Sequence, residues 1–297
     1  MELLIYLILF LLVLIVSSTT NKLLPFLPLP LVQILLGIVI GLFLPNTDFH
    51  LNTELFLALV IGPLLFRESE EADITAILKH WRIIIYLIFP VIFISTLSLG
   101  GLAHLLWLSL PLAACLAVGA ALGPTDLVAF ASLSERFSFP KRVSNILKGE
   151  GLLNDASGLV AFQVALTAWT TGAFSLGQAS SSLIFSILGG FLIGFLTAMT
   201  NRFLHSFLLS VRATDIASEL LLELSLPLVT FFLAEEIHVS GIIAVVVAGI
   251  LKASRFKKIT LLEAQVDTVT ETVWHTVNFM LNGSVFVILG MELEMIA

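Results

Sequence analysis

Residues 110–133 read LPLAACLAVGAALGPTDLVAFASL, an apolar segment that a Gly-Pro-Thr-Asp step interrupts in its middle. Proline removes a backbone donor and clashes with the preceding helical turn, and Gly123 before Pro124 weakens the helix further. Thr125 and Asp126 are good caps for a helix that starts again. The pattern predicts one discontinuous helix made of two half-helices, and a plain proline kink is the alternative.

The composition of the chain places this segment in a membrane. The chain has 297 residues, of which 58% are hydrophobic and 12% charged, whereas soluble domains are about 25% charged. Hydropathy this high over the whole length predicts an all-α polytopic membrane protein. The single cysteine, Cys115, excludes a disulfide within the chain and a metal site built on thiolates. It is interpreted as a buried structural thiol.

About ten segments are apolar enough to be transmembrane helices, because a bilayer core needs about 20 residues per helix and fewer where a helix is half buried. They lie near 2–17, 29–44, 53–66, 82–106, 110–133, 147–171, 180–203, 215–233, 239–252 and 266–292. No positive charge precedes the first segment, so it is interpreted as a retained span rather than a signal peptide. The chain, 1–297, is predicted to be a single transmembrane domain.

The basic residues test that number of spans. All 14 Lys and Arg fall in odd-numbered loops or in the span ends that border them. Because cytoplasmic loops carry an excess of Lys and Arg, the odd loops are predicted to be cytoplasmic and the N-terminus outside, in the cell (inner) membrane. Loop three, 67–81, mixes both signs and is interpreted as a solvated interfacial helix. Loop nine, 252–258, is basic, which predicts contact with anionic lipid headgroups; nothing predicts nucleic-acid binding.

A second polar motif, GEGLLNDASG at 149–158, opens the sixth predicted span. Acidic residues inside spans cost roughly 2.5–3.5 kcal/mol on insertion scales and mark ion or proton pathways by default. Asp155 follows Glu150 by five residues, about 140° around a helix, so one carboxylate can bind a transported ion while the other pairs with a fixed cation. Oxygens of Asp155, Asn154 and freed carbonyls suit a hard monovalent cation, and a carboxylate also takes a proton. A buried polar network that only fixes packing is the alternative.

Two further sets of residues have ordinary interpretations. Glu219 and Glu223 lie four residues apart on one face of the eighth span, where a structural or interfacial role is favoured over a site in the bundle interior. The pairs Gly37–Gly41 and Gly190–Gly194 have the small-xxx-small spacing of packed helices.

Together the motifs resemble those of the monovalent cation:proton antiporters, in particular the electroneutral, NhaP-like sodium/proton exchanger branch. The matching segments cover nearly the whole chain: PLPLVQILLGIVIG at 28–41, GPLLF at 62–66, GPTDLVA at 123–129, GEGLLNDASGLV at 149–160, LAEEIHVSGIIAVVVAGI at 233–250 and VFVILGMEL at 285–293. The third and fourth segments in combination are specific, and the others alone are weak.

The resemblance implies exchange of Na⁺, or of K⁺ or Li⁺, for H⁺, with Asp155 binding cation and proton alternately. Na⁺ is expected at Asp155 and Thr125, and Asn154 is implied to stabilise the site. Asp126 would offset the positive end of a half-helix, and Glu150 would pair with an arginine on a later helix. The implied fold has inverted repeats and works as a homodimer by an elevator-like movement. No cofactor is expected beyond the transported Na⁺ and H⁺.

Two features depart from that branch. The residue after the motif glutamate is often serine there and is Gly151 here, so one side-chain oxygen is lost. The branch usually has about thirteen spans and this chain about ten, so the arginine partner of Glu150 is expected beyond residue 297. The chain is then a fragment, a truncated product or a protein completed by another chain. A non-transporting protein that dimerises with or regulates a full-length partner and a cation channel are the alternatives to exchange, and an enzyme is not expected.

Overall fold

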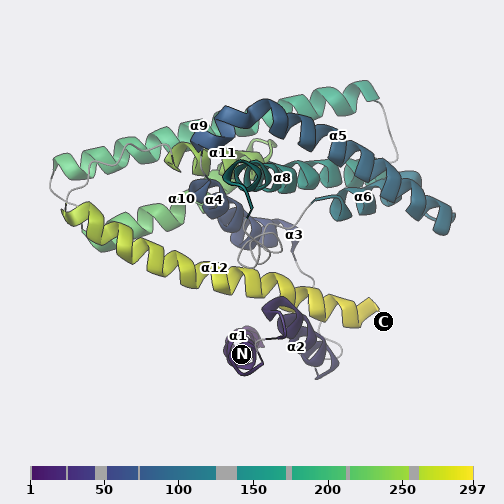
Figure 1. Ribbon diagram of the computed structural model, residues 1–297, viewed down its shortest axis with the longest axis horizontal. Coiled ribbons are helices and arrows are strands. Elements are labelled where there is room, and N and C mark those ends of the chain that lie inside the picture. Colours follow the sequence, from purple (N-terminus) through teal and green to yellow (C-terminus); the bar gives the residue numbers. More distant parts are fainter. Residues whose placement is uncertain are drawn as a thin grey trace. The chain divides into compact units, whose positions relative to one another are not determined.

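The computed structural model describes residues 2–24, 26–43, 52–72, 74–124, 139–171, 176–211, 215–253 and 261–296, and every regular element within these ranges is helical. In chain order (Figure 1) the helices are α1 (Glu2–Leu23), α2 (Leu29–Phe43), α3 (Thr53–Phe56), the π-helical turn η1 (Leu57–Ile61), α4 (Gly62–Glu71), α5 (Ile74–Leu106), α6 (Leu112–Leu122), α8 (Lys141–Thr171), α9 (Leu176–Ser210), α10 (Ile216–Glu236), α11 (Gly241–Ala253) and α12 (Leu261–Ile296).

Each predicted span overlaps helical residues of the structure. Of the segment 110–133, the structure describes α6 and the two residues that follow it, and the remainder lies outside the described residues. Among the described residues, three helical stretches are long and apolar enough to cross a membrane by length and composition: Phe185–Ser210, Ile216–Glu236 and Thr268–Leu293. Shorter apolar helices of 10–17 residues accompany them among the described residues, and the number of ten spans stays a prediction.

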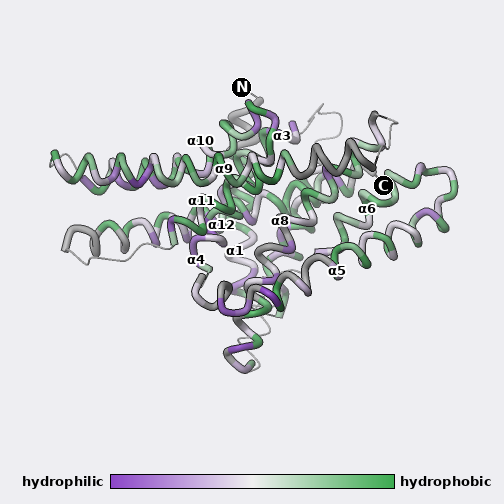
Figure 2. The backbone as a smooth tube through the Cα atoms, turned by 90° about the horizontal axis from the view of Figure 1, so that it is seen from above, coloured by the Kyte–Doolittle hydropathy of each residue, from purple (hydrophilic) through white to green (hydrophobic). Residues whose placement is uncertain are grey.

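Large hydrophobic side chains lie on the outside of the helices. Phe93, Phe185 and Phe203 are each more than half exposed. Figure 2 shows hydrophobic residues over most of the length of the helices, with hydrophilic residues in short stretches between them. A helix that is apolar on its outer face as well as its inner one suits a lipid environment.

The packing divides the chain into two compact units. The first comprises Met1–Leu64 and Ile259–Ala297, and the second comprises Leu65–Lys258. The first unit therefore holds α1, α2, α3, η1 and α12, and the second holds α5 to α11 with most of α4. The assignment of 1–297 to a single transmembrane domain stays a prediction.

In the first unit, α2 and α12 cross at two glycines. A Cβ atom on Gly37 would overlap the carbonyl oxygen of Val287, and one on Gly290 would overlap that of Ile34. The two backbones therefore touch, which residues without a side chain allow. Gly37 therefore lies at a contact between two helices, as its spacing predicts. The second helix, α12, belongs to the same chain.

In the second unit, α10 and α11 both pack against α9. Gly190 lies against the carbonyl of Ser240, just before α11, and Gly194 lies against that of Ala244 in α11; neither has room for a Cβ atom, which agrees with their predicted packing role. The Thr230 hydroxyl of α10 donates to the Thr197 hydroxyl of α9 at 3.0 Å, and Thr230 is fully buried. Small residues and a buried hydroxyl pair thus join α9, α10 and α11.

Candidate functional site

Two polar residues of the GEGLLNDASG motif are buried on α8. Glu150 is 7% exposed and Asn154 is 0% exposed, and their spacing of four residues puts them on one helix face. α8 packs against α5 and α6 within the second unit. Both residues make contacts within the chain, so Glu150 is not an isolated buried charge. A carboxylate and an amide are therefore held inside an otherwise apolar bundle.

The predicted helix break lies beside this part of α8. α6 ends at Leu122, and Gly123 and Pro124 follow it outside the helix. Gly158, one turn beyond Asn154, is buried, and a Cβ atom there would overlap the ring of Pro124. The close approach of α8 to the end of α6 thus depends on a glycine at position 158. The structure thus brings the Gly123–Pro124 step against the helix that carries the second polar motif.

The predicted ion ligands fall largely outside the described part of the structure. Thr125 and Asp126 lie outside it, and of Asp155 only the backbone, within α8, is described. The Na⁺ site at Asp155 and Thr125 and the second half-helix therefore stay predictions. Among the residues that the structure describes, no three His, Cys, Asp or Glu side chains are grouped so as to hold a metal ion.

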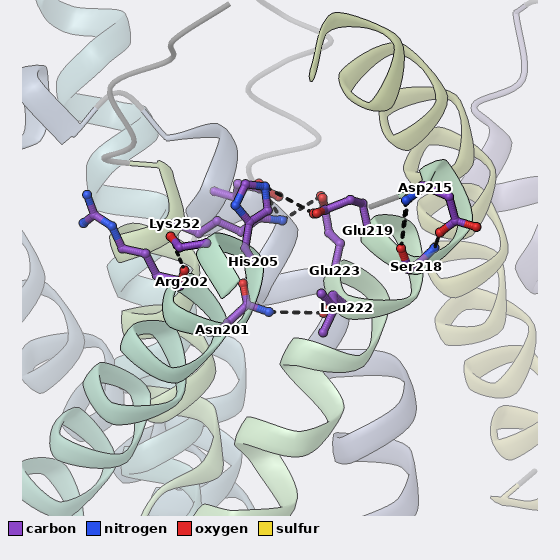
Figure 3. Close-up of polar contacts among 11 residues, drawn as sticks. Asn201, Arg202, His205, Asp215, Ser218, Glu219, Leu222, Glu223 and Lys252 are labelled. Atoms are coloured by element: carbon purple, nitrogen blue, oxygen red, sulfur yellow. Dashed lines mark hydrogen bonds and ion pairs between the residues drawn. The ribbon is translucent and has the colours of Figure 1, made fainter. Parts of the chain in front are cut away.

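A second set of polar side chains, which we term the ion-pair cluster, joins α4, α9, α10 and α11 (Figure 3). Its members are Arg67, Glu70, Glu71, His205, Glu219, Glu223 and Lys252. At its centre, the Lys252 ammonium lies 2.7 Å from Glu223 Oε1 and 3.1 Å from Glu70 Oε1, and the lysine side chain is 9% exposed. The Arg67 guanidinium adds contacts of 3.0 Å to Glu70 and 2.7 Å to Glu71.

Close packing of α11 on α4 brings Lys252 to its partners. A Cβ atom on Gly249 would lie 2.5 Å from the Phe66 carbonyl oxygen, so a larger residue would push the two helices apart. The Lys252 ammonium also lies 5.5 Å from the centroid of the Phe66 ring, within the range of a cation–π attraction. Gly249 and Lys252 thus lie on the same turn of α11. The first allows the contact with α4, and the second is the central cation of the cluster.

The other half of the cluster joins α9 to the beginning of α10. His205 Nε2 lies 3.3 Å from Glu219 Oε2, and the Asn201 amide donates to the Leu222 carbonyl at 3.4 Å. Both contacts are visible in Figure 3. They hold the end of α9 against the first turns of α10.

Asp215 caps the N-terminus of α10. Its carboxylate accepts a hydrogen bond from the Ser218 backbone N–H at 2.8 Å, and the Ser218 hydroxyl accepts from the Asp215 backbone N–H at 3.2 Å. The Ser218 side chain first, and its backbone N–H second, lower the pKa of the Asp215 carboxyl below its ordinary value. This reciprocal capping box fixes where α10 begins.

The cluster gathers helix ends that the basic residues assign to one side of the membrane. α4 runs into loop three, α9 and α10 flank loop seven, and α11 runs into loop nine. These loops are all odd-numbered, and the structure brings their helix ends together within the second unit. This agrees with the prediction that they share a side; that the side is cytoplasmic stays a prediction.

The sequence pattern misplaced several members of the cluster. The interpretation of loop three as a solvated helix is wrong for Arg67 and Glu70, whose side chains are 14% and 16% exposed. The basic segment 252–258 predicts contact with lipid headgroups, and this is wrong for Lys252, which is bound by two glutamates. Two features of the sequence could have indicated the cluster. One is the pair Glu219 and Glu223, four residues apart in an apolar helix, and the other is Lys252 in the last turn of another apolar helix.

The sequence also matches a known family. The family model for the sodium/hydrogen exchanger transmembrane region matches residues 7–297. The chain belongs to this exchanger family. Membership confirms the predicted resemblance and makes the chain a membrane protein of a transporter family rather than one of a family of enzymes.

Relatives and a solved structure agree with the exchanger assignment. The chain is 38% identical over 278 residues to the sodium, potassium, lithium and rubidium/H(+) antiporter of Bacillus subtilis (strain 168), covering 94% of this chain and 42% of that protein. It is 32% identical over 301 residues to the uncharacterized Na(+)/H(+) exchanger YjcE of Escherichia coli (strain K12), covering 99% of this chain and 54% of that protein. The chain thus spans about half the length of these relatives.

The fold matches that of a solved antiporter. The sodium proton antiporter MjNhaP1 from Methanocaldococcus jannaschii superposes with a TM-score of 0.75 at 20% identity, over 98% of this chain and 71% of that one. The predicted all-α polytopic antiporter fold is therefore confirmed.

Proposed function

We propose that this exchanger-family chain moves Na⁺, or K⁺ or Li⁺, against H⁺ across the cell (inner) membrane. The observation that carries the proposal is α8, whose buried face holds Glu150 and Asn154 and which meets the residues at the end of α6 through Gly158. Polar groups placed inside an apolar helix bundle mark ion pathways by default. The names of the Bacillus relatives, which include sodium, potassium, lithium and rubidium, support the same range of cations.

Asp155 is the proposed carrier of both ions. It follows the fully buried Asn154 in α8. A carboxylate is neutral both as the protonated acid and with one bound monovalent cation. A site that alternates between these two forms therefore moves no net charge, and exchange through Asp155 is electroneutral. Thr125 and Asp126, which follow the end of α6, complete the proposed site.

Exchange is tested in inverted membrane vesicles that hold a proton gradient reported by a pH-sensitive dye. Added Na⁺ should dissipate the gradient, and Asp155→Asn should abolish the response, because an amide binds neither ion in the same way. Glu271→Gln is the matched control, since it removes an exposed carboxylate of α12 and should leave the response intact. Equal responses from the wild type and Asp155→Asn would sink the proposal, and a response carried by current would favour a channel.

The membrane orientation and a homodimeric state are proposed with this function. Cys115→Ala removes the only cysteine and gives a background for labelling. In intact cells an impermeant maleimide should label Ser109→Cys, between α5 and α6, and should not label Ser210→Cys at the end of α9. The reverse pattern would invert the topology. Light scattering of the solubilised chain should give the mass of two chains, and the mass of one would exclude the dimer.

A further inference from the structure

The end of α6 touches α5 as well as α8. A Cβ atom on Gly123 would lie 2.7 Å from the Ser95 hydroxyl oxygen and 3.5 Å from Ser95 Cβ. The first distance is a steric overlap, and the second is an ordinary van der Waals contact. The backbone of Gly123 has φ −75° and ψ −38°, a right-handed conformation that any residue adopts. The glycine therefore makes room for Ser95, and its backbone angles do not require it.

The Ser95 hydroxyl is held in one place on α5. It donates a hydrogen bond to the Ile92 carbonyl at 3.1 Å, one turn back on the same helix. Ile92 is buried and belongs to a hydrophobic cluster of α5 against which Ala161 of α8 packs. The oxygen that faces Gly123 is thus fixed relative to the contact between α5 and α8.

Ser95 is the contact with α5 that reaches the helix break. Nearer the start of α6 the two helices touch through their backbones, since a Cβ atom on Gly119 would lie 2.7 Å from the Gly100 nitrogen. One turn later, where α6 ends, a side-chain hydroxyl replaces this backbone contact. Glycine contacts therefore fix the body of α6 on α5, and the serine extends the contact to Gly123.

The Gly123–Pro124 step is consequently held from two sides. Ser95 of α5 lies against Gly123, and Gly158 of α8 lies against the ring of Pro124. The hydrophobic cluster joins α5 and α8 to each other close to both contacts. Three helices thus form a closed set of contacts around the step, and a change at Ser95 removes one of the two that hold it.

We propose that Ser95 is a positioning residue for the cation site: its hydroxyl sets the distance between α5 and the Gly123–Pro124 step, from which Thr125 and Asp126 follow. The inference rests on the proposed function, because the ligands that Ser95 positions are those proposed there. Ser95 acts through Gly123 rather than on the ion. Without the hydroxyl the step is held from the α8 side alone, so the ligands are less well placed and the cation binds more weakly.

An exchange of side-chain size between the two positions tests the contact. In the vesicle assay, the Na⁺ concentration that gives half the maximal response is measured separately from the maximal response itself. Gly123→Ala puts a methyl group on the Ser95 hydroxyl and should raise the half-saturating concentration about tenfold or more, since a misplacement of about 1 Å can cost on the order of 100-fold. Ser95→Ala should raise it less, by several-fold. In the double variant the two Cβ atoms lie 3.5 Å apart, so adding Ser95→Ala should recover most of the loss caused by Gly123→Ala.

The half-saturating concentration separates positioning from a merely structural role. A structural role would lower the maximal response together with the amount of chain in the membrane and leave the half-saturating concentration unchanged. Ser98→Ala, which removes an exposed hydroxyl of the same helix, is the matched control and should change neither quantity. An unchanged half-saturating concentration in Ser95→Ala, or a double variant no better than Gly123→Ala, would overturn the proposal.

The wild type shows which inference fails. If it gives no response to Na⁺, K⁺ or Li⁺, the proposed exchange fails and the role of Ser95 fails with it. If the wild type responds and Ser95→Ala behaves like Ser98→Ala, only the role of Ser95 is lost. Should Gly123→Ala not reach the membrane, the comparison of Ser95→Ala with Ser98→Ala decides the question alone.

Discussion

The buried face of α8 and the ion-pair cluster both place charged side chains among apolar helices, and they differ in the polar groups that share each face. In the cluster, the carboxylates form ion pairs with fixed cations: the Lys252 ammonium lies within 3.1 Å of carboxylate oxygens of both Glu70 and Glu223. On α8, Glu150 shares its face with the neutral amide of Asn154. Carboxylates that already hold a lysine hold helices together, whereas Asp155 of α8, the proposed carrier, has to take up and release its cation.

The two regions also differ in how they are built. The α8 region depends on glycine, since Gly158 admits Pro124 at the end of α6. The cluster also has a glycine, Gly249, at the contact of α11 with α4, but its own contacts are made by long charged side chains from different helices. A change of volume should therefore damage the first region most, and a change of charge should damage the second.

The largest effect on stability is expected from Lys252→Met. Methionine keeps most of the side-chain volume and removes the charge, which leaves Glu70 and Glu223 facing each other with their side chains 16% and 14% exposed. Removing one partner of a buried ion pair costs about 3 kcal/mol or more. The midpoint temperature of thermal unfolding should therefore fall. It can be measured by the reaction of a thiol-reactive dye with Cys115, the single cysteine, which is fully buried in the folded chain.

A second substitution shows whether that loss comes from the charge. Adding Glu223→Gln to Lys252→Met should recover part of the stability, because it removes one of the two carboxylates left without the ammonium. Glu71→Gln is the matched control, since that carboxylate is 58% exposed and such surface pairs contribute about 0–1 kcal/mol. If Lys252→Met were no more harmful than Glu71→Gln, the cluster would behave as an ordinary surface network.

The next effect is expected from Gly158→Ala in the α8 region. The added methyl group would overlap the Pro124 ring, and forcing extra volume into a packed interior costs about 1–3 kcal/mol. Cation exchange should fall as well, because the end of α6 moves away from the motif. Gly101→Ala in α5 is the matched control, since no atom lies within 4 Å of its added Cβ. Equal effects of the two alanines would mean that the contact with Pro124 does not matter.

Sequence could single out the α8 region because its information is local. The Gly123–Pro124 step and the polar residues of one short motif stand out against apolar neighbours, and α6 does end at Leu122. The helices could be placed because a long apolar stretch and a polar loop are also local features. The proposed ligands at Thr125, Asp126 and Asp155 stay predictions.

The cluster was not predicted because its partners are far apart in the chain. Glu70 and Lys252 meet only when α4 packs on α11, and Gly249 permits that approach. A charge next to a loop looks the same in the sequence whether it faces water or a partner on another helix. Glu219 and Glu223 were the nearest to a usable signal, because two carboxylates on one apolar face need a partner.

The smallest effect is expected at Asp215, at the exposed edge of the second region. Hydrogen bonds from Ser218 lower the pKa of this carboxyl, so its ionised form stabilises α10 above the ordinary pKa of aspartate. That contribution is lost as the pH falls below about 4.

Asp215→Asn keeps a side-chain oxygen for the Ser218 N–H and removes the titration, so α10 should lose less stability on acidification than in the wild type. Asp215→Ala removes the cap as well and should weaken the start of α10 at every pH. Hydrogen exchange of the amides at the start of α10, compared between variants at the same pH, measures both effects. An acid response of Asp215→Asn equal to that of the wild type would show that Asp215 is not the group responsible.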